Sequence, residues 1–254
     1  MITNLKDKIR ETIVSKDNIA IWWLGQAGFC IKTDRGNVIY IDPYLSDAVE
    51  RLCGFKRMSL SPIKVEEVEA DFVICTHEHP DHLDPDAIPI TTKTSKTRFI
   101  GPRSCVQEFR KIGIDKRRII EMAKGKTFEI EGFSITGVYA DHGKLSEDAI
   151  GILFDFGKVT IYNCGDTAYR PEQMNYVKSR QPDIIIPPIN GQFGNLNEKE
   201  AVLLSKYVKA KLAIPCHFWM FAEHNGNPAL FMEIAKKEKI IAKLLSPGET
   251  FVYG

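Results

Sequence analysis

The chain has 254 residues, of which 44% are hydrophobic and 26% charged, and its 34 Lys and Arg against 33 Asp and Glu leave a formal net charge of +1. This length allows one large domain or two small ones with a substantial core, and the even spread of apolar residues excludes long disorder. The near-zero charge lacks the surplus of Lys and Arg that is typical of nucleic-acid binders, so we expect no nucleic-acid partner.

The N-terminal segment 1–15 predicts an amphipathic helix, with Leu5, Ile9 and Ile13 on one face. It lacks the apolar core and cleavage site of a signal peptide, and no apolar run in the chain reaches the roughly 18 residues that a membrane span needs. We therefore expect a cytoplasmic protein with no membrane partner. The helix either packs on its own domain or forms an interface in a homo-oligomer.

Strand signals dominate the rest of the chain. Short runs rich in β-branched or aromatic residues, bounded by Gly, Asp or Pro, predict strands at 19–24, 29–33, 38–41, 72–76, 98–101, 119–122, 127–130, 133–140, 151–156, 159–164, 184–187 and 212–215. Helical patterns occur at 105–112, 171–179, 198–208 and 228–238. Asn197, three residues before Glu200, predicts a capping box at the start of the third. Since helices fall between groups of strands, we expect mixed sheets faced by helices. No linker rich in Pro, Gly or Ser interrupts the chain, which predicts a single domain over 1–254.

Two predicted hairpins share one plan. In 28–42 and again in 151–166, a strand, a tight glycine turn and a buried second strand lead to an aspartate, Asp42 in the first and Asp166 in the second. Such hairpins are common, so chance similarity and a duplicated half-domain stand as equal alternatives.

The six cysteines are widely spaced and form no Cys-x-x-Cys pair, so no disulfide framework is expected. Cys30, Cys75, Cys164 and Cys216 lie in strand-like apolar runs. These four are predicted to be buried structural thiols.

The strongest signal is segment 76–82, Thr-His-Glu-His-Pro-Asp-His, directly after an apolar strand. Imidazole suits zinc and similar divalent ions, and a carboxylate among the ligands favours a hydrolytic site over a structural one. His77 and His79 would lie on one face of extended chain, with Asp81 and His82 one turn further on. This one segment could therefore provide ligands to two metal ions. The simpler alternative is a solvated polar loop.

His-x-His-x-Asp-His after a buried strand resembles the hallmark of the metallo-β-lactamase superfamily. The resemblance implies an α+β fold, a four-layer αββα sandwich of two similar halves with a binuclear metal site at one edge. It also implies ligands at later strand ends, which the chain offers in the family's order: His142 in Ala-Asp-His-Gly, Asp166 in Cys-Gly-Asp-Thr and His217 in Pro-Cys-His-Phe.

The resemblance assigns seven residues to two metal sites: His77, His79 and His142 to the first, Asp81, His82 and His217 to the second, and Asp166 as the bridge. Asp42 matches an aspartate that steadies the His-x-His segment; the alternative for it is a turn former at a strand end. Two divalent ions, zinc or manganese, are the implied cofactors. A hydroxide that bridges them would be the nucleophile, with Asp81 and Asp166 as catalytic residues.

Three flanking segments narrow the resemblance. Segments 22–29, 41–46 and 215–218 are similar to the branch that contains L-ascorbate-6-phosphate lactonase. This implies a metal-dependent hydrolase acting on a small anionic lactone, ester or phosphoester. Loops near the metals would contact this substrate, and the candidate residues are Arg170, Asn190, Asn195, Trp219 and His224.

Three other functions are alternatives to hydrolysis of a small molecule. A phosphodiesterase or nuclease of the same fold usually adds a domain that grips nucleic acid, which neither the length nor the +1 charge suggests. A di-iron redox protein would need a flavin partner and tends to carry a carboxylate where His79 stands. A non-catalytic metal-binding sensor is disfavoured by the complete ligand set.

Overall fold

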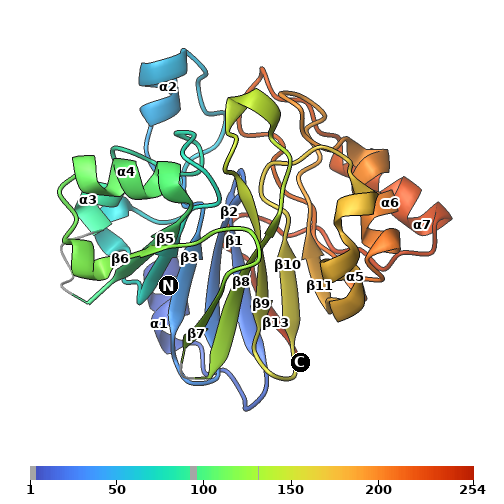
Figure 1. Ribbon diagram of the computed structural model, residues 1–254, viewed down its shortest axis with the longest axis horizontal. Coiled ribbons are helices and arrows are strands. Elements are labelled where there is room, and N and C mark those ends of the chain that lie inside the picture. The colour runs from blue at the N-terminus through green and yellow to red at the C-terminus, as the bar shows by residue number, and fades with distance from the viewer. Residues whose placement is uncertain (1–3, 92–95, 131) are drawn as a thin grey trace. The chain divides into compact units, whose positions relative to one another are not determined.

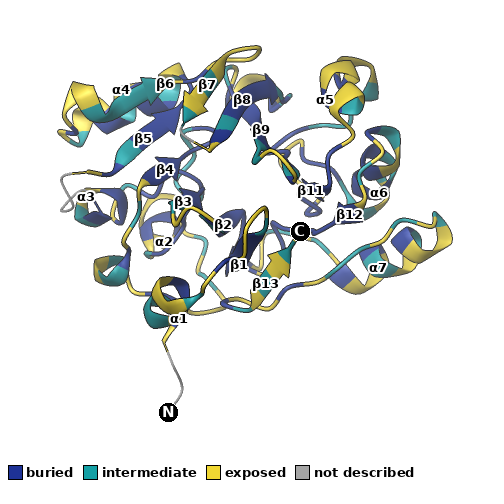
Figure 2. Cartoon of the chain, turned by 90° about the horizontal axis from the view of Figure 1, so that it is seen from below, coloured by how far each residue is buried: buried dark blue, intermediate teal, exposed yellow. Residues whose placement is uncertain are grey.

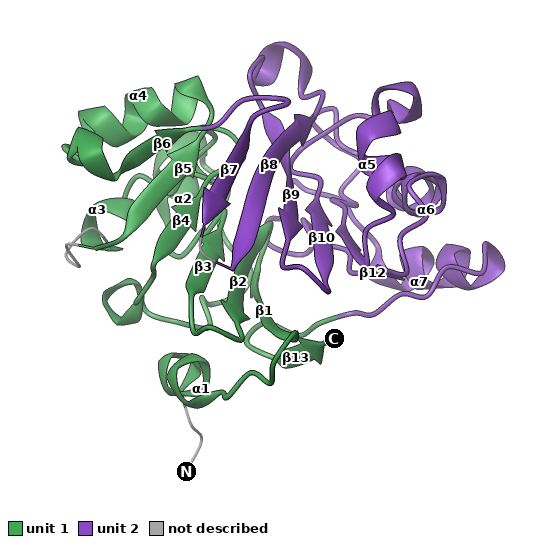
Figure 3. Cartoon of the chain, turned by 60° about the horizontal axis from the view of Figure 1, so that its bottom comes forward, with its two compact units in different colours: residues 1–121, 245–254 green, residues 122–244 purple. Residues whose placement is uncertain are grey.

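The structure, a computed structural model, describes residues 4–91, 96–130 and 132–254. The chain divides into two units, residues 1–121 with 245–254 and residues 122–244, and each unit is built on its own mixed β-sheet (Figure 3). The single domain over 1–254 that the sequence suggests stays a prediction. Within the described residues, no helix has the length and apolar character needed to cross a membrane.

The first unit contains, among its described residues, a seven-stranded sheet in the order β13-β1-β2-β3-β4-β5-β6 (Figure 1). Strands β13, β1, β2 and β3 pair antiparallel, and β3 to β6 pair parallel. The strands are β1 (Ile19–Gly25), β2 (Gly28–Thr33), β3 (Val38–Ile41), β4 (Phe72–Ile74), β5 (Arg98–Gly101), β6 (Ile119–Glu121) and β13 (Thr250–Tyr253). The helices are α1 (Leu5–Glu11), α2 (Ala48–Cys53), α3 (Ile88–Thr91) and α4 (Arg103–Lys111), with 3-10 turns η1 (Val65–Glu67) and η2 (Lys116–Arg118).

The core of this unit follows from strand periodicity. Successive side chains of a strand point to opposite faces, so Ala20, Trp22 and Leu24 of β1 share one face. That face packs in one apolar cluster with residues of α1, α3 and α4, among them Leu5 and Phe109. Every residue of β1 is buried, whereas β13 alternates exposed and half-buried residues, as the dark blue of β1 and the yellow and teal of β13 show in Figure 2.

The second unit contains, in its described part, a six-stranded sheet in the order β12-β11-β10-β9-β8-β7. Strands β7 to β10 pair antiparallel, and β10, β11 and β12 pair parallel. The strands are β7 (Thr127–Ile130), β8 (Phe133–Tyr139), β9 (Ile150–Asp155), β10 (Thr160–Asn163), β11 (Ile184–Ile186) and β12 (Leu212–Ala213). The helices are α5 (Asn175–Arg180), α6 (Glu198–Tyr207) and α7 (Pro228–Lys237), with 3-10 turns η3 (Gly143–Leu145) and η4 (Pro171–Gln173).

The two hairpins noted in the sequence occupy the same place in their sheets. β2–β3 and β9–β10 are antiparallel pairs, and each second strand then pairs parallel with the next strand in the chain, β4 or β11. An aspartate precedes that next strand in both units. The Asp71 carboxylate accepts the N–H of Val38, and the Asp183 carboxylate accepts that of Thr160. This shared plan favours a duplicated half-domain over chance similarity.

Most predicted elements are present with ends shifted by a few residues, but some predictions were wrong. The helix predicted over 1–15 spans only Leu5–Glu11; residues 1–3 lie outside the described part. It stops because Thr12 takes an extended backbone at the start of a β-branched run, and Ile13, predicted on the apolar face, is 93% exposed. The helix predicted over 171–179 is instead a 3-10 turn, η4, followed by α5.

Two local predictions are confirmed. The Asn197 side chain accepts the N–H of Glu200, whose carboxylate accepts the N–H of Asn197, so a capping box begins α6. The four cysteines placed in strand-like runs are buried free thiols. Cys105 is also buried and Cys53 is exposed.

Candidate metal centre

The His-x-His-x-Asp-His motif begins at His77, shortly after β4 ends, and Asp42, directly after β3, holds Thr76, the residue before the motif. The Asp42 carboxylate accepts the N–H of Thr76 at 2.7 Å and its hydroxyl at 2.8 Å, and it lies 2.9 Å from Nδ1 of His82. An ionised carboxylate only accepts hydrogen bonds, so Nδ1 of His82 carries the proton and Nε2 keeps its lone pair. Asp42 thus orients His82 as carboxylates orient metal-binding histidines.

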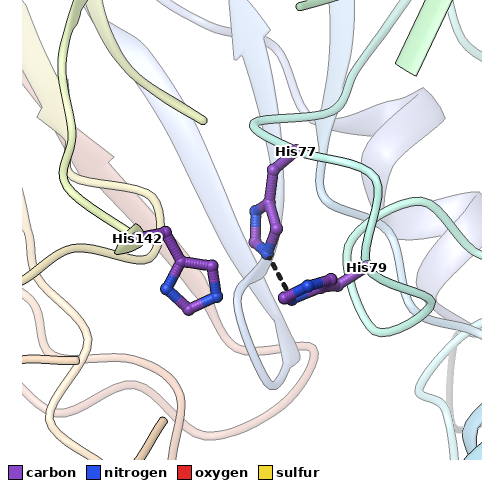
Figure 4. A group of neighbouring side chains, drawn as sticks. All are labelled: His77, His79 and His142. Atoms are coloured by element: carbon purple, nitrogen blue, oxygen red, sulfur yellow. Dashed lines mark hydrogen bonds between the residues drawn. The ribbon is translucent and has the colours of Figure 1, made fainter. Parts of the chain in front are cut away.

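His77 and His79 follow directly, and Figure 4 shows their rings joined by a hydrogen bond. Nε2 of His77 lies 3.0 Å from Nδ1 of His79. The ring of His77 is also 4.0 Å, centroid to centroid, from that of His82, and both of these histidines are fully buried. Three imidazoles gathered at one strand end concentrate nitrogen ligands of the kind that zinc, iron and manganese accept.

Asp81 is held by Gln26, a residue for which the sequence predicts no role. The Gln26 side-chain amide donates to Oδ2 of Asp81 at 2.8 Å. Gln26 is fully buried in the turn between β1 and β2, with a left-handed backbone (φ 48°). Its partner lies 55 residues away. Only the fold reveals this contact, although the segment that contains Gln26 carried part of the family resemblance.

Asp84, a buried carboxylate for which the sequence predicts no role, holds two loops beside the motif in place. It accepts the N–H groups of Leu45 and Ser46 at 2.9 and 2.8 Å and the Ser46 hydroxyl at 2.6 Å. It also accepts the N–H groups of Asp86 and Ala87. Asp84 therefore fastens the loop after Asp42 to the turn after His82.

Cys75 stands directly before the motif but is no candidate ligand. Its thiol is fully buried, and burial, reinforced by the negative charges of Asp42 and Asp84, raises the pKa of Cys75 well above its usual value. Only a thiolate binds metal strongly. The candidate donors of the first unit are therefore imidazoles and a carboxylate.

In the second unit, Asp166 is the centre of the candidate ligands. Nε2 of His142 lies 3.8 Å from Oδ2 of Asp166, and Nε2 of His217 lies 3.4 Å from Oδ1. The Asn195 side-chain amide donates to Oδ2 at 2.7 Å. All four residues are buried. Asn195, expected to contact substrate, is thus in contact with the Asp166 carboxylate.

Backbone hydrogen bonds join the three loops that carry these side chains. Ala168 donates its N–H to the carbonyl of Asp141, the residue before His142, at 2.8 Å. Leu196, the residue after Asn195, donates to the carbonyl of Thr167 at 3.0 Å, and the Thr167 hydroxyl accepts the N–H of Asp141. His142, Asp166 and Asn195 are therefore positioned by one network rather than by three independent loops.

The remaining substrate candidates separate into two groups. Asn190, Trp219 and His224 line a cavity of about 630 Å³, and the ring of His224 stacks on that of His217 at 5.0 Å. Arg170 does not line this cavity, and its Nε lies 2.9 Å from the Asp141 carboxylate.

The donor chemistry of both units fits divalent metal ions. Each unit offers imidazole nitrogens beside one carboxylate, and each of those carboxylates, Asp81 and Asp166, is held by a buried side-chain amide. Mixed nitrogen and carboxylate donors suit zinc, manganese and iron.

Comparison with known proteins agrees with the fold and the donors. A family model described as a beta-lactamase superfamily domain matches residues 20–217. A UPF0173 metal-dependent hydrolase of Methanopyrus kandleri is 30% identical over 244 residues, covering 91% of this chain and 98% of that protein. One of Polynucleobacter asymbioticus is 28% identical over 248 residues, covering 90% and 84%.

Two solved structures share the fold at low sequence identity. Igni18, a metallo hydrolase of Ignicoccus hospitalis, superposes with a TM-score of 0.77 at 21% identity, covering 93% of this chain and 99% of that chain. An isothiocyanate hydrolase from Delia radicum gut bacteria does so with a TM-score of 0.73 at 21% identity, covering 92% and 99%. The predicted α+β metallo-β-lactamase fold, with two mixed sheets, is confirmed.

Fold, donors and relatives define a class, the metal-dependent hydrolases of the metallo-β-lactamase superfamily. Within this class, the chain belongs to the UPF0173 family of metal-dependent hydrolases.

Proposed function

We propose that this chain is a binuclear hydrolase that cleaves a small anionic lactone, ester or phosphoester, in the manner of the L-ascorbate-6-phosphate lactonase branch that it resembles. One observation carries the proposal: both units present a carboxylate beside imidazoles and fix it with a buried amide. Gln26 holds Asp81 in the first unit, and Asn195 holds Asp166 in the second. A duplicated half-domain that supplies ligands twice is well suited to holding two ions.

The ligands are assigned as the resemblance implies: His77, His79 and His142 to one ion, Asp81, His82 and His217 to the other, and Asp166 between them. Zinc or manganese bound there would lower the pKa of water to about 7 and stabilise negative charge on the substrate oxygen. Asp42 accepts the N–H of Nδ1 of His82, so the lone pair of this imidazole lies on Nε2, the atom that would bind a metal ion. We assign to the Asp81 carboxylate the transfer of the proton from the attacking water to the leaving oxygen.

The same proposal covers partners and location. A small molecule is the expected substrate, and the balance of 34 basic against 33 acidic residues supports the absence of a nucleic-acid partner. We also propose a cytoplasmic location, and sedimentation of the full chain tests whether it forms a homo-oligomer.

A turnover panel tests the proposal. Lactones, carboxylic esters, phosphodiesters, nucleotides and an isothiocyanate are offered to the full chain with zinc and manganese varied. We expect turnover of a lactone, ester or small phosphoester that a chelator abolishes and added metal restores. Turnover only of nucleotide phosphodiesters or of the isothiocyanate would contradict the proposed substrate class. No turnover of any compound by the metal-loaded chain would contradict the proposal itself.

The role of Asp81 has its own test. Asp81→Asn keeps the size and one acceptor oxygen but removes the proton acceptor, so we expect kcat to fall by a factor of about 100 or more. Asp86→Asn is the matched control, because that exposed carboxylate pairs with Arg51 at the surface and should leave kcat unchanged. Full turnover by Asp81→Asn with metal bound would exclude the role.

A further inference from the structure

The cavity of the second unit has a lining of unusual composition. Its volume of about 630 Å³ falls in the range of small-molecule sites. Its polar lining is dominated by four side-chain amides beside the Glu198 carboxylate and the His224 imidazole: Asn190, Asn197, Asn225 and Asn227. Amides donate and accept hydrogen bonds without carrying charge, so this lining is suited to a polar but uncharged ligand.

Asn190 supplies the clearest sign that a ligand is accommodated. The residue is 1% exposed, and its Oδ1 is buried with no hydrogen-bond partner among the described residues. Its Nδ2 donates to the carbonyl of Gln192 at 3.4 Å, which fixes the orientation of the amide. A buried carbonyl oxygen without a donor is costly. The position therefore calls for a ligand hydroxyl or N–H group.

Trp219 provides a flat apolar surface at the same cavity. Its side chain is 62% exposed, although tryptophan is on average highly buried, and its backbone is left-handed (φ 56°). Gly226 lies so close that a Cβ there would be 2.7 Å from that of Phe218, so glycine is required for the loop 224–227 to approach. A strained backbone that holds a large ring exposed is typical of a binding site.

The charged side chains at the cavity favour a neutral ligand over an anionic one. Of the described residues that line the cavity, none is Lys or Arg, whereas Glu198 contributes a carboxylate and His224 an imidazole. Arg170, the cation expected to contact an anionic substrate, pairs with Asp141. An anionic group in this cavity would therefore meet the like charge of Glu198, while a neutral group would not.

We propose that the cavity binds a neutral ring carrying hydroxyl groups, a cyclic polyol or sugar, stacked on Trp219 and donating a hydroxyl to Oδ1 of Asn190. The stacking of His224 on His217 places the cavity beside a candidate metal ligand. The ring is therefore the part of the substrate remote from the cleaved bond, while any negative charge lies at the reacting group. That last assignment rests on the proposed function; binding of the ring does not.

Tryptophan fluorescence gives a test that is independent of turnover. Trp22 and Trp23 are 0% and 5% exposed, so acrylamide quenching of the full chain reports mainly on Trp219. The probes are methyl glucopyranoside and methyl glucuronopyranoside, which differ in one carboxylate and contain no ester or lactone bond. We expect the neutral glycoside to protect Trp219 with an apparent Kd of about 1 mM and the glucuronide to bind about tenfold more weakly.

Two variants separate the contributions. Glu198→Gln retains an oxygen that can accept the N–H of Asn227, as Glu198 does, and should bring the two glycosides to within about threefold of each other. Asn190→Ala should weaken the neutral glycoside about tenfold. Tyr176→Ala, at an exposed aromatic side chain of α5 outside the lining, should change neither value.

The outcomes distinguish this inference from the proposed function. No protection of Trp219 by the neutral glycoside, or equal or tighter binding of the glucuronide by the unaltered chain, would overturn the inference. Either result can coexist with full hydrolytic activity. Conversely, protection by the neutral glycoside in a chain that hydrolyses nothing would support the inference and contradict the proposed function.

Discussion

Residues of the candidate centre hold a backbone conformation that side chains with a Cβ seldom adopt. The φ angles of Gln26, Asp42, His217 and Trp219 are 48°, 45°, 62° and 56°. Each such residue costs about 1–3 kcal/mol unless its surroundings compensate. Asp42 is compensated by its three hydrogen bonds to the motif. Backbone strain at these four residues is expected if their side chains must point in directions that an unstrained backbone would not allow.

Asp42 gives the first prediction at this scale. Asp42→Asn tolerates the left-handed backbone but loses the charge that orients His82, so zinc affinity should fall about 10–100-fold. The free energy of unfolding should fall by about 2–4 kcal/mol. Equilibrium dialysis against zinc and urea unfolding measure the two effects.

The control for Asp42 is Asp71→Asn, which alters a carboxylate that accepts one backbone N–H at the start of β3. It should cost about 1 kcal/mol and leave zinc affinity unchanged. If Asp42→Asn kept the affinity of the unaltered chain, Asp42 would be the strand-end turn former that the sequence left as the alternative.

Asn195 gives the second prediction. Asn195→Ala removes the amide that donates to Asp166, so both zinc affinity and kcat/KM on the substrate found by the panel should fall about 10–100-fold. Asn175→Ala is the control, because its exposed amide pairs with Tyr207 away from the ligands. Loss of kcat/KM with unchanged zinc affinity would instead place Asn195 in contact with substrate, as the sequence alone had suggested.

At the scale of elements, one carboxylate joins the starts of three parallel strands. Asp183 precedes β11, accepts the N–H and hydroxyl of Thr160 at the start of β10, and pairs with Lys211 just before β12. Burial alone would raise the pKa of Asp183, but the hydrogen bonds from Lys211 and Thr160 outweigh it and hold the pKa below its ordinary value.

This depressed pKa predicts how the stability changes with pH. A carboxylate whose pKa is lowered by folding stabilises the fold fully above its unfolded pKa, 3.8, and loses that effect as the pH falls through the folded value. Asp183→Asn should therefore cost about 1 kcal/mol at neutral pH and progressively less below 3.8. Thermal unfolding across this pH range measures the difference.

Asp155→Asn serves as the control for this series. Asp155 pairs with Arg180 at the surface, and removing such a pair should change stability by less than about 0.5 kcal/mol at any pH. A cost of Asp183→Asn that grew on acidification would contradict the assigned direction of the shift.

Elements were predictable where the pattern was strong and local. The apolar run before the motif gave β4, and the spacing of Asn197 and Glu200 gave the start of α6. β13 was missed because it is a four-residue edge strand whose residues alternate exposed and half-buried. α2, of six residues with a left-handed Gly54 after it, and α3, of four, are too short to show a helical period.

At the scale of the molecule, the sequence predicted the fold because the candidate ligands stand at strand ends in the family's order. It did not predict the residues that hold those candidate ligands. Gln26 and Asn195 are ordinary loop residues by composition, and their partners lie 55 and 29 residues away. Such contacts arise only when the chain folds, so no local pattern contains them. Arg170 is the opposite case, a residue that the sequence predicted to contact substrate. It stands close to Asp166 in the sequence, but its guanidinium pairs with the Asp141 carboxylate.

The proposed function requires that the full chain bind two divalent ions. The most direct measurement is the metal content of the chain by mass spectrometry after loading with zinc or manganese and removal of excess metal. We predict about two equivalents per chain for the unaltered protein and about one or fewer for both His82→Ala and His217→Ala. One equivalent or none bound by the unaltered chain after loading with either metal would contradict the binuclear account.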